Sequence, residues 1–326
     1  MGGEWGEDAL NKILITRPLP ASVMQKAETF GDVTARNQTT PLSADEMLSA
    51  LCDYDIVLPT LGDLFSEKIF RQIETPKCKL LANFGVGYNH IDVKAAKSRG
   101  ILVSNTPGAV TDATADIALT LMLMTARRAG EGERLLREGN WQGWHPTQML
   151  GLHMSGKTVS VIGMGRIGEA IARRCHFGFG MKVLYASRSE KKMDFPSMQL
   201  PSINEAVAQA DFVVTAVPGG ASTKHLVGQD LFASMPSHSI FVNISRGDVV
   251  DESALITALQ TGQIGGAGLD VYELEPVIPD ALVQLENVTL LPHLGTASLE
   301  IRTEMGDMAL KNIEDFIEGR SLPNLV

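Results

Sequence analysis

The chain has little cysteine, few aromatic residues and fewer basic than acidic side chains. Its 326 residues include only 3 cysteines, Cys52, Cys78 and Cys175, which lack the spacing of a disulfide framework or a zinc site. We therefore expect reduced thiols, no bound metal and a cytoplasmic location. The net charge of −10 and the 6% aromatic content argue against nucleic-acid binding, because no basic face or stacking motif is present.

Long apolar runs are also lacking. The longest, residues 117–126, is well short of the roughly 20 residues that a membrane-spanning helix needs, and no signal-peptide pattern opens the chain. The glycine-rich, acidic stretch Met1–Asn11 is expected to include an added leader. A chain of 326 residues with 44% hydrophobic content exceeds what one core usually supports, so we predict two lobes and small-molecule ligands.

Short apolar segments alternate with helical ones throughout the chain, which indicates an α/β fold with parallel sheets. In the first lobe, strands are predicted at 12–16, 55–59, 80–83 and 101–104, and a helix begins at Ala21. A long apolar helix over 110–128 leads to a second set of strands at 158–162, 182–185, 212–216, 240–244, 268–271 and 289–291. The last helix, 297–318, follows no unpaired strand, so we expect it to return to the first lobe.

The segment 157–189 is the most informative, because it combines a strand, a glycine-rich turn, a helix and a second strand. Gly163, Gly165 and Gly168 have the spacing G-x-G-x-x-G, which permits a tight turn, close approach of a pyrophosphate and close packing of helix on strand. Three glycines can also simply make a turn. The flanking strand and helix favour a dinucleotide site, with phosphates at the helix N-terminus.

The end of the second strand indicates which dinucleotide is bound. An NAD site usually carries Asp or Glu there, but this chain has Ser187, Arg188 and Ser189. Arg188 can pair with a 2′-phosphate and the serines can donate hydroxyl hydrogen bonds, so NADP(H) is preferred and NAD(H) is the alternative. The simpler interpretation is that Arg188 is a solvated charge near Lys191 and Lys192.

Arg246, Glu275 and His293 stand where three late strands end. Taken singly, they could be an ion-pair partner, part of a turn and a core histidine. Because the carboxyl ends of parallel strands border the ligand crevice, the three side chains could instead converge there. Together they suit carbonyl reduction: Arg246 binds and polarises a keto acid, His293 protonates the carbonyl oxygen, and Glu275 orients the imidazole.

Nearly the whole chain resembles the D-isomer-specific 2-hydroxyacid dehydrogenases. VIGMGRIGEAIARR, NISRGDVVDESALITALQTGQIGGAGLDVYELEP and ENVTLLPHLGTAS are similar to the family's signatures in order and separation. The resemblance implies that Arg246, Glu275 and His293 are the catalytic trio. It also implies further site residues: Arg166 and Ile167 on the pyrophosphate turn, Asp270 at the nicotinamide carboxamide, the Val86 and Gly87 N–H groups at the substrate carboxylate, and Leu61 in a neighbouring substrate loop.

The resemblance further implies two Rossmann-like lobes in an interrupted arrangement. Residues 1–107 and 297–326 would form a substrate-binding domain, residues 108–296 an inserted dinucleotide-binding domain, and the protein a homodimer through the cofactor domain. The segment NWQGWHPTQMLG is similar to the glyoxylate and hydroxypyruvate reductases. Trp144 could therefore reach a partner's substrate pocket, or both tryptophans of this segment could pack the dimer interface.

These observations predict NADPH-dependent reduction of a small 2-keto acid, glyoxylate or hydroxypyruvate, by hydride transfer with His293 as general acid. Reduction should weaken as the pH rises, because it needs a protonated imidazole. The rivals are reduction of 2-ketogluconate or phenylpyruvate, a 3-phosphoglycerate, formate or phosphite dehydrogenase, and a non-catalytic dinucleotide-sensing corepressor-like protein. The complete trio argues against the corepressor-like protein. The chain end at Val326, soon after the closing helix, argues against a 3-phosphoglycerate dehydrogenase.

Overall fold

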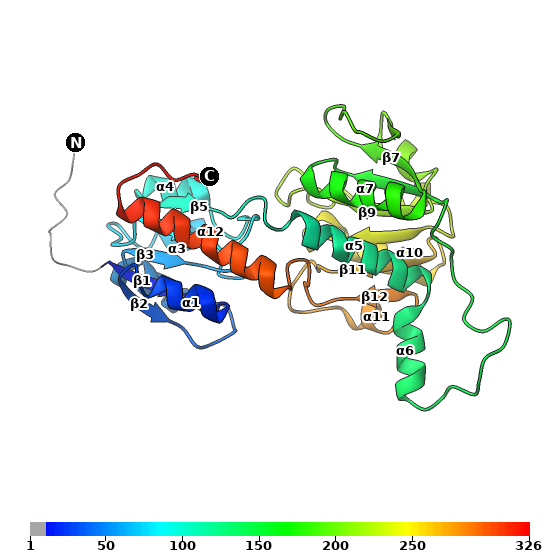
Figure 1. Cartoon of the computed structure of the whole chain (residues 1–326), viewed down its shortest axis with the longest axis horizontal. Helices are drawn as coiled ribbons and strands as arrows, with labels where there is room; N and C mark the ends of the chain where they lie inside the picture. The colour runs from blue at the N-terminus through cyan, green and yellow to red at the C-terminus, as the bar shows by residue number, and fades with distance from the viewer. Residues whose placement is uncertain (1–10) are drawn as a thin grey trace. The chain divides into compact units, whose positions relative to one another are not determined.

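The computed structural model describes residues 11–326 and divides into two compact units (Figure 1). Unit 1 contains the described residues up to Val110 together with Ser298–Val326, and unit 2 contains Thr111–Ala297. Each unit holds one parallel sheet with helices on both faces, which confirms the predicted α/β fold class of two Rossmann-like lobes. The leader expected within the first eleven residues falls almost wholly outside the described part of the chain.

Unit 1 contains a five-stranded parallel sheet. Its strands are β1 (Lys12–Ile15), β2 (Asp32–Ala35), β3 (Ile56–Leu58), β4 (Leu80–Ala82) and β5 (Leu102–Ser104). The spatial order is β2-β1-β3-β4-β5, so the direction of winding reverses between β1 and β3. In open parallel sheets, ligands bind outside the carboxyl ends of the strands at such a reversal.

The helices of unit 1 cover both faces of this sheet. Successive strand residues point to opposite faces, so Ile13 and Ile15 pack with α1 (Ala21–Ala27) and α12 (Leu299–Ile317). Leu14 packs on the other face with α2 (Ala44–Asp53), α3 (Glu67–Phe70) and α4 (Val93–Ser98). Figure 1 shows α12 beside α1, so the last helix of the chain belongs to the first lobe, as its sequence predicts.

Unit 2 contains a seven-stranded parallel sheet in the order β12-β11-β10-β9-β6-β7-β8. Its strands are β6 (Thr158–Ile162), β7 (Lys182–Ala186), β8 (Ser197–Gln199), β9 (Phe212–Thr215), β10 (Ile240–Asn243), β11 (Gly266–Leu269) and β12 (Val288–Leu290). The winding reverses between β6 and β9. Strand β11 begins two residues before the predicted 268–271 and ends before Asp270, because Gly266 and Gly268 extend it while giving little hydrophobic signal.

Two layers of helices enclose the sheet of unit 2. One face packs against α5 (Thr111–Ala126) and α7 (Arg166–Phe179), and the other against α8 (Ile203–Val207), α9 (Gln229–Ser234), α10 (Glu252–Gln260) and α11 (Asp280–Val283). The helix predicted over 110–128 ends at Ala126. Arg128 has a φ of 53°, and this left-handed residue separates α5 from α6 (Ala129–Arg137).

The three cysteines are free thiols, as predicted. Cys52 is exposed, whereas burial raises the pKa of both Cys78 and Cys175 to about 12. Within residues 11–326, no helix is long and apolar enough to cross a membrane, and no cluster of three or more His, Cys, Asp or Glu side chains could hold a metal ion.

Candidate active site

The glycine-rich turn lies between β6 and α7, at the reversal point of the unit 2 sheet. Gly163 has a φ of 95°, and a Cβ there would lie 2.6 Å from the Ala216 carbonyl oxygen of the loop after β9. A Cβ on Gly168 would lie 2.1 Å from the Gly163 carbonyl oxygen, so α7 can approach β6 only with glycine here. A Cβ on Gly165 would meet nothing within 4 Å. The first and third glycines are thus required by packing, and the second leaves open space beside the helix N-terminus.

This open space fits the pyrophosphate of a nicotinamide dinucleotide. Arg166 and Ile167 begin the 14-residue helix α7, whose first N–H groups have no partner within the helix. Strand β7 lies next to β6, so Ser187, Arg188 and Ser189 stand at the same edge of the sheet. Arg188 is exposed and forms no ion pair with any of the residues 11–326.

The predicted catalytic residues follow three adjacent strands. Arg246 comes after β10, Glu275 after β11 and His293 after β12, and these strands are neighbours in the sheet. The structure brings two of them into direct contact, since His293 Nδ1 lies 2.9 Å from Glu275 Oε2. The other carboxylate oxygen, Oε1, accepts a hydrogen bond of 3.0 Å from the Tyr272 N–H.

Electrostatics at this edge keep Glu275 ionised. Burial alone would raise the pKa of Glu275, but the hydrogen bond with His293, the Tyr272 amide and the Arg246 charge together lower it. Burial lowers the pKa of the Arg246 guanidinium, and the neighbouring carboxylates Glu275 and Asp248 oppose that change. Glu275 therefore interacts electrostatically with both the Arg246 cation and the His293 imidazole, a combination suited to acid–base chemistry on a carbonyl.

Asp270 holds the loop that carries His293. Its Oδ1 accepts the Leu294 N–H at 2.6 Å, and its Oδ2 accepts the Gly295 N–H at 2.8 Å. His293 itself has a φ of 53°, a left-handed conformation that costs a non-glycine residue about 1–2 kcal/mol. The two hydrogen bonds to the following residues stabilise this conformation. The sequence suggested only a cofactor contact for Asp270, because nothing in it indicates a clamp on residues so much later in the chain.

The other predicted substrate residues, Val86, Gly87 and Leu61, belong to unit 1. The Asn83 side-chain amide donates to the Gly85 and Gly87 carbonyl oxygens at 3.0 and 3.1 Å. His90 Nε2 lies 3.0 Å from the Asn83 carbonyl oxygen Oδ1, so this histidine orients the amide. Neither Asn83 nor His90 was predicted from the sequence to support this loop.

The loop carrying Val86 presents two uncommitted donors. The Asn105 amide donates to the Val86 carbonyl oxygen at 2.9 Å. The N–H groups of Val86 and Gly87 have no hydrogen-bond partner among residues 11–326. These N–H groups are thus available to a ligand, while the carbonyl groups of the same residues accept hydrogen bonds from Asn105 and Asn83.

Trp144 lies in the connection between α6 and β6 and is 79% exposed. Trp141 in the same connection is 50% exposed. Exposed indole rings of this size are typical of surfaces that bind a partner or ligand.

Comparison with known proteins supports the family that the sequence resembles. Residues 119–295 match the sequence model described as "D-isomer specific 2-hydroxyacid dehydrogenase, NAD binding domain". The glyoxylate reductase of Korarchaeum cryptofilum is 40% identical over 97% of this chain and 95% of its own length. The glycerate dehydrogenase of Hyphomicrobium methylovorum is 34% identical over 95% of this chain and 97% of its own length.

Solved structures of similar proteins cover almost the entire chain. The TT0316 protein from Thermus thermophilus is 36% identical, with a TM-score of 0.88 over 97% of this chain and 99% of that one. The NADPH-dependent glyoxylate/hydroxypyruvate reductase from Sinorhizobium meliloti, in complex with NADP and malonate, is 32% identical, with a TM-score of 0.86 over 98% and 97%. These matches confirm the resemblance: the chain belongs to the D-isomer-specific 2-hydroxyacid dehydrogenase family, as an NAD(P)-dependent oxidoreductase that acts on CH–OH groups.

Proposed function

We propose that this enzyme reduces a small 2-keto acid, glyoxylate or hydroxypyruvate, to the 2-hydroxy acid with NADPH, and that His293 is the general acid. The observation that carries the proposal is the 2.9 Å contact between His293 Nδ1 and Glu275 Oε2. Glu275 accepts at Nδ1, which leaves Nε2 as the ring atom that can give a proton to substrate. The relatives named for glyoxylate reduction support the choice of a small keto acid.

Each site residue has a distinct task in this mechanism. The hydride would come from the nicotinamide dinucleotide when it is bound. Arg246 pairs with the substrate carboxylate and polarises the adjacent ketone, while His293 Nε2 donates a proton to the carbonyl oxygen. Glu275 stabilises the imidazolium before the transfer, and its lowered pKa keeps it ionised for that purpose. In the reverse reaction the neutral imidazole accepts the proton.

Unit 1 supplies the proposed substrate contacts. The Val86 and Gly87 N–H groups bind the substrate carboxylate, and their lack of partners among the described residues supports this role. Leu61 contacts the body of the substrate. Residues 1–107 and 297–326 thus act as the substrate-binding domain, and residues 108–296 as the dinucleotide-binding domain.

The cofactor is held by the glycine-rich turn and by the residues after β7. Gly163, Gly165 and Gly168, with Arg166 and Ile167 at the start of α7, bind the pyrophosphate. Asp270 contacts the nicotinamide carboxamide. Ser187, Arg188 and Ser189 bind the 2′-phosphate, and the exposed guanidinium of Arg188 supports a preference for NADPH over NADH.

The protein is further proposed to be a homodimer through its cofactor domain. The exposed Trp144 supports this, either as an interface residue or as a contact in the partner's substrate pocket. Sedimentation of the wild type and of Trp144→Ala separates these roles. An interface residue changes the association constant, whereas a pocket residue raises the KM for the keto acid in an intact dimer.

The first experiment follows NADPH oxidation with glyoxylate, hydroxypyruvate, pyruvate, phenylpyruvate and 2-ketogluconate, repeated with NADH. We expect the highest kcat/KM for glyoxylate or hydroxypyruvate with NADPH. A preference for a bulky keto acid would contradict the proposed substrate, and a higher kcat/KM with NADH would contradict the cofactor. No turnover of any keto acid, with dinucleotide binding intact, would contradict the catalytic function.

A further inference from the structure

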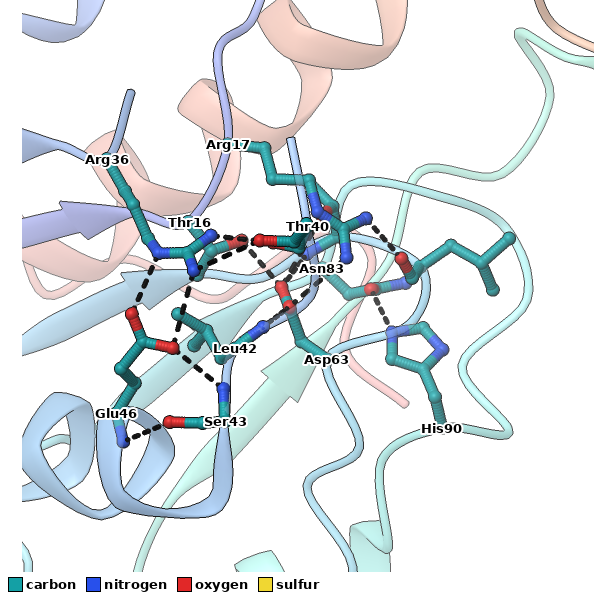
Figure 2. Close-up of polar contacts among 12 residues, drawn as sticks. Thr16, Arg17, Arg36, Thr40, Leu42, Ser43, Glu46, Asp63, Asn83 and His90 are labelled. Atoms are coloured by element: carbon teal, nitrogen blue, oxygen red, sulfur yellow. Dashed lines mark hydrogen bonds and ion pairs between the residues drawn. The ribbon is translucent and has the colours of Figure 1, made fainter. Parts of the chain in front are cut away.

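A polar network lies at the reversal point of the unit 1 sheet, where it joins the loops that follow β1 and β3. Strands β1 and β3 are neighbours there, and their carboxyl ends are followed by Thr16 and Arg17 on one side and by Thr60 and Leu61 on the other. In open parallel sheets, this is where the ligand crevice begins. Figure 2 shows the polar contacts that connect these strand ends.

Asp63 is the centre of the network. Its side chain is 0% exposed and accepts hydrogen bonds from the Thr16 hydroxyl at 2.6 Å, the Thr60 N–H at 2.9 Å and the Leu42 N–H at 2.9 Å (Figure 2). The Asp63 N–H in turn donates to the Thr60 carbonyl oxygen at 3.1 Å. One carboxylate therefore joins three loops and closes the turn from Thr60 to Asp63.

Arg17 holds the same turn at its apex. Its Nη1 donates to the Leu61 carbonyl oxygen at 2.5 Å, while Nη2 lies 3.5 Å from Asp63 Oδ1, an ion-pair distance. The side chain is 17% exposed. Its Nε and Nη2 atoms are shielded from solvent and have no hydrogen-bond partner within residues 11–326.

A guanidinium buried in this way is a poor source of stability. The cost of removing the charge from water is only partly offset when two of its nitrogen atoms form no hydrogen bond. A buried charge with unsatisfied donors therefore calls for an explanation other than folding. Its one hydrogen bond is to the Leu61 carbonyl oxygen, so the Leu61 peptide group is what Arg17 holds.

We propose that Arg17 and Asp63 are positioning residues of the substrate site, which fix the Thr60–Asp63 turn so that Leu61 meets the keto acid in one conformation. This inference rests on the proposed contact between Leu61 and substrate. Leu61 is half-buried, Gly62 beside it is exposed, and Thr60 is buried, so the turn is anchored at both ends and projects only at its apex. Holding such a group within about 0.5 Å is what selective binding of a small substrate requires.

Arg36 offers a matched control in the same unit. Its side chain is 13% exposed, close to the 17% of Arg17. It also pairs with one carboxylate, Glu46 at 3.0 Å, and donates to one backbone carbonyl, Thr40 at 2.6 Å (Figure 2). The hydrogen bonds of Arg36 all go to Thr40 and Glu46, outside the Thr60–Asp63 turn, so its replacement removes similar interactions without releasing Leu61.

The test compares Arg17→Met, Arg17→Lys and Arg36→Met in the full-length enzyme. We expect Arg17→Met to raise the KM for glyoxylate about tenfold and to lower the ratio of kcat/KM for glyoxylate over phenylpyruvate, with the KM for NADPH unchanged. Arg17→Lys restores one donor and one charge, and should recover part of the ratio. Arg36→Met should leave the ratio at the wild-type value. Equal ratios in Arg17→Met and Arg36→Met would overturn the proposal.

Hydrogen exchange gives a readout that does not depend on turnover. Peptides spanning residues 59–65 should exchange faster in Arg17→Met than in the wild type, and at the wild-type rate in Arg36→Met. Unchanged exchange in Arg17→Met would refute the positioning role even if the enzyme reduces keto acids. If Arg17→Met exchanges faster but the wild-type enzyme reduces no keto acid, Arg17 still fixes the turn and the proposed function is refuted. If Arg17→Met does not fold, Arg17→Lys takes its place; a smaller rise in exchange over residues 59–65 is then expected, and unchanged exchange would refute the positioning role.

Discussion

Asp63 in unit 1 and Asp270 in unit 2 occupy comparable places in two similar parallel sheets. Both lie beyond the carboxyl end of a strand, both are buried, at 0% and 1% exposure, and both accept hydrogen bonds from backbone N–H groups. Each holds a loop that carries a proposed substrate contact, Leu61 in one case and His293 in the other. The two differ in how their negative charge is compensated.

Asp63 has a permanent cation, since Arg17 Nη2 lies 3.5 Å away. Asp270 forms no ion pair with a lysine or arginine among the described residues, and burial raises its pKa. The charge on Asp270 is favoured by His293 and disfavoured by Glu275. The charge of Asp63 is therefore compensated by a guanidinium, whereas the charge of Asp270 faces the imidazole of His293, the proposed proton donor.

The largest expected effect distinguishes a reacting histidine from a supporting one. His293→Gln should lower kcat for keto-acid reduction by about 10³-fold, because the proton donor is lost while the loop keeps a polar side chain. The remaining activity should lose the wild-type pH dependence. Steady-state rates between pH 5.5 and 9 measure both quantities.

His90→Gln is the control for that comparison. His90 contacts Asn83 at 3.0 Å and acts through it on the Val86–Gly87 loop. We expect the KM for the keto acid to rise severalfold, with kcat and its pH profile close to those of the wild type. A loss of kcat comparable to that of His293→Gln would contradict the assignment of His90 as a supporting residue and His293 as the proton donor.

The two aspartates provide the second prediction. Asp270→Asn removes the acceptor of one backbone N–H and relaxes the left-handed His293, so kcat should fall by about 10–100-fold. Asp63→Asn should act mainly on the keto-acid KM, with a smaller change in kcat. Single-turnover measurements at saturating substrate separate the two effects. Equal loss of kcat in both variants would remove the distinction between the two clamps.

The sequence predicted most of the fold because parallel strands buried on both faces have a strong signal. Strands β9 and β10 each begin with three consecutive apolar residues, and β6 is buried from its second residue onward; the predicted bounds of all three agree with the structure to within a residue. The strands that were missed, β2 and β8, lie at sheet edges with mostly exposed or half-buried residues. Such strands are held by neighbouring backbone and need no apolar pattern.

The positions of the proposed reacting groups follow from the sequence pattern, whereas those of their supports do not. Arg246, Glu275 and His293 each follow a strand, and the carboxyl ends of these strands share one edge of the sheet. Asp63 and Thr16 are 47 residues apart in the chain, and no spacing rule connects a buried carboxylate with a hydroxyl at that distance. Supporting contacts of this kind depend on the folded arrangement of loops, which the sequence does not encode in a local pattern.

The third prediction uses the glycine-rich turn. Gly168→Ala places a methyl group 2.1 Å from a carbonyl oxygen and should cost about 1–3 kcal/mol of stability. Gly165→Ala meets no protein atom within 4 Å, so its melting temperature should match the wild type while the KM for NADPH rises about tenfold. Thermal melts without cofactor and NADPH titrations test both. A destabilised Gly165→Ala variant, or one with unaltered NADPH affinity, would contradict the proposal that Gly165 leaves space for the pyrophosphate.

The smallest effect comes from Glu275 and Asp270 in the unit 2 site. Their contributions to the free energy of unfolding should change with pH in opposite directions. The pKa of Glu275 is lowered, so just below about pH 4.3 the unfolded chain binds more protons there than the folded one, and stability rises with pH. The pKa of Asp270 is raised by burial, so just above about pH 3.9 the folded chain binds more protons, and stability falls as pH rises. Melting temperatures of wild type, Glu275→Gln and Asp270→Asn between pH 3.5 and 7 measure the two slopes. Relative to wild type, Glu275→Gln should lose stability with rising pH and Asp270→Asn should gain it. If both differences had the same sign, Asp270 would be compensated as fully as Asp63, and the contrast between the two units would not hold.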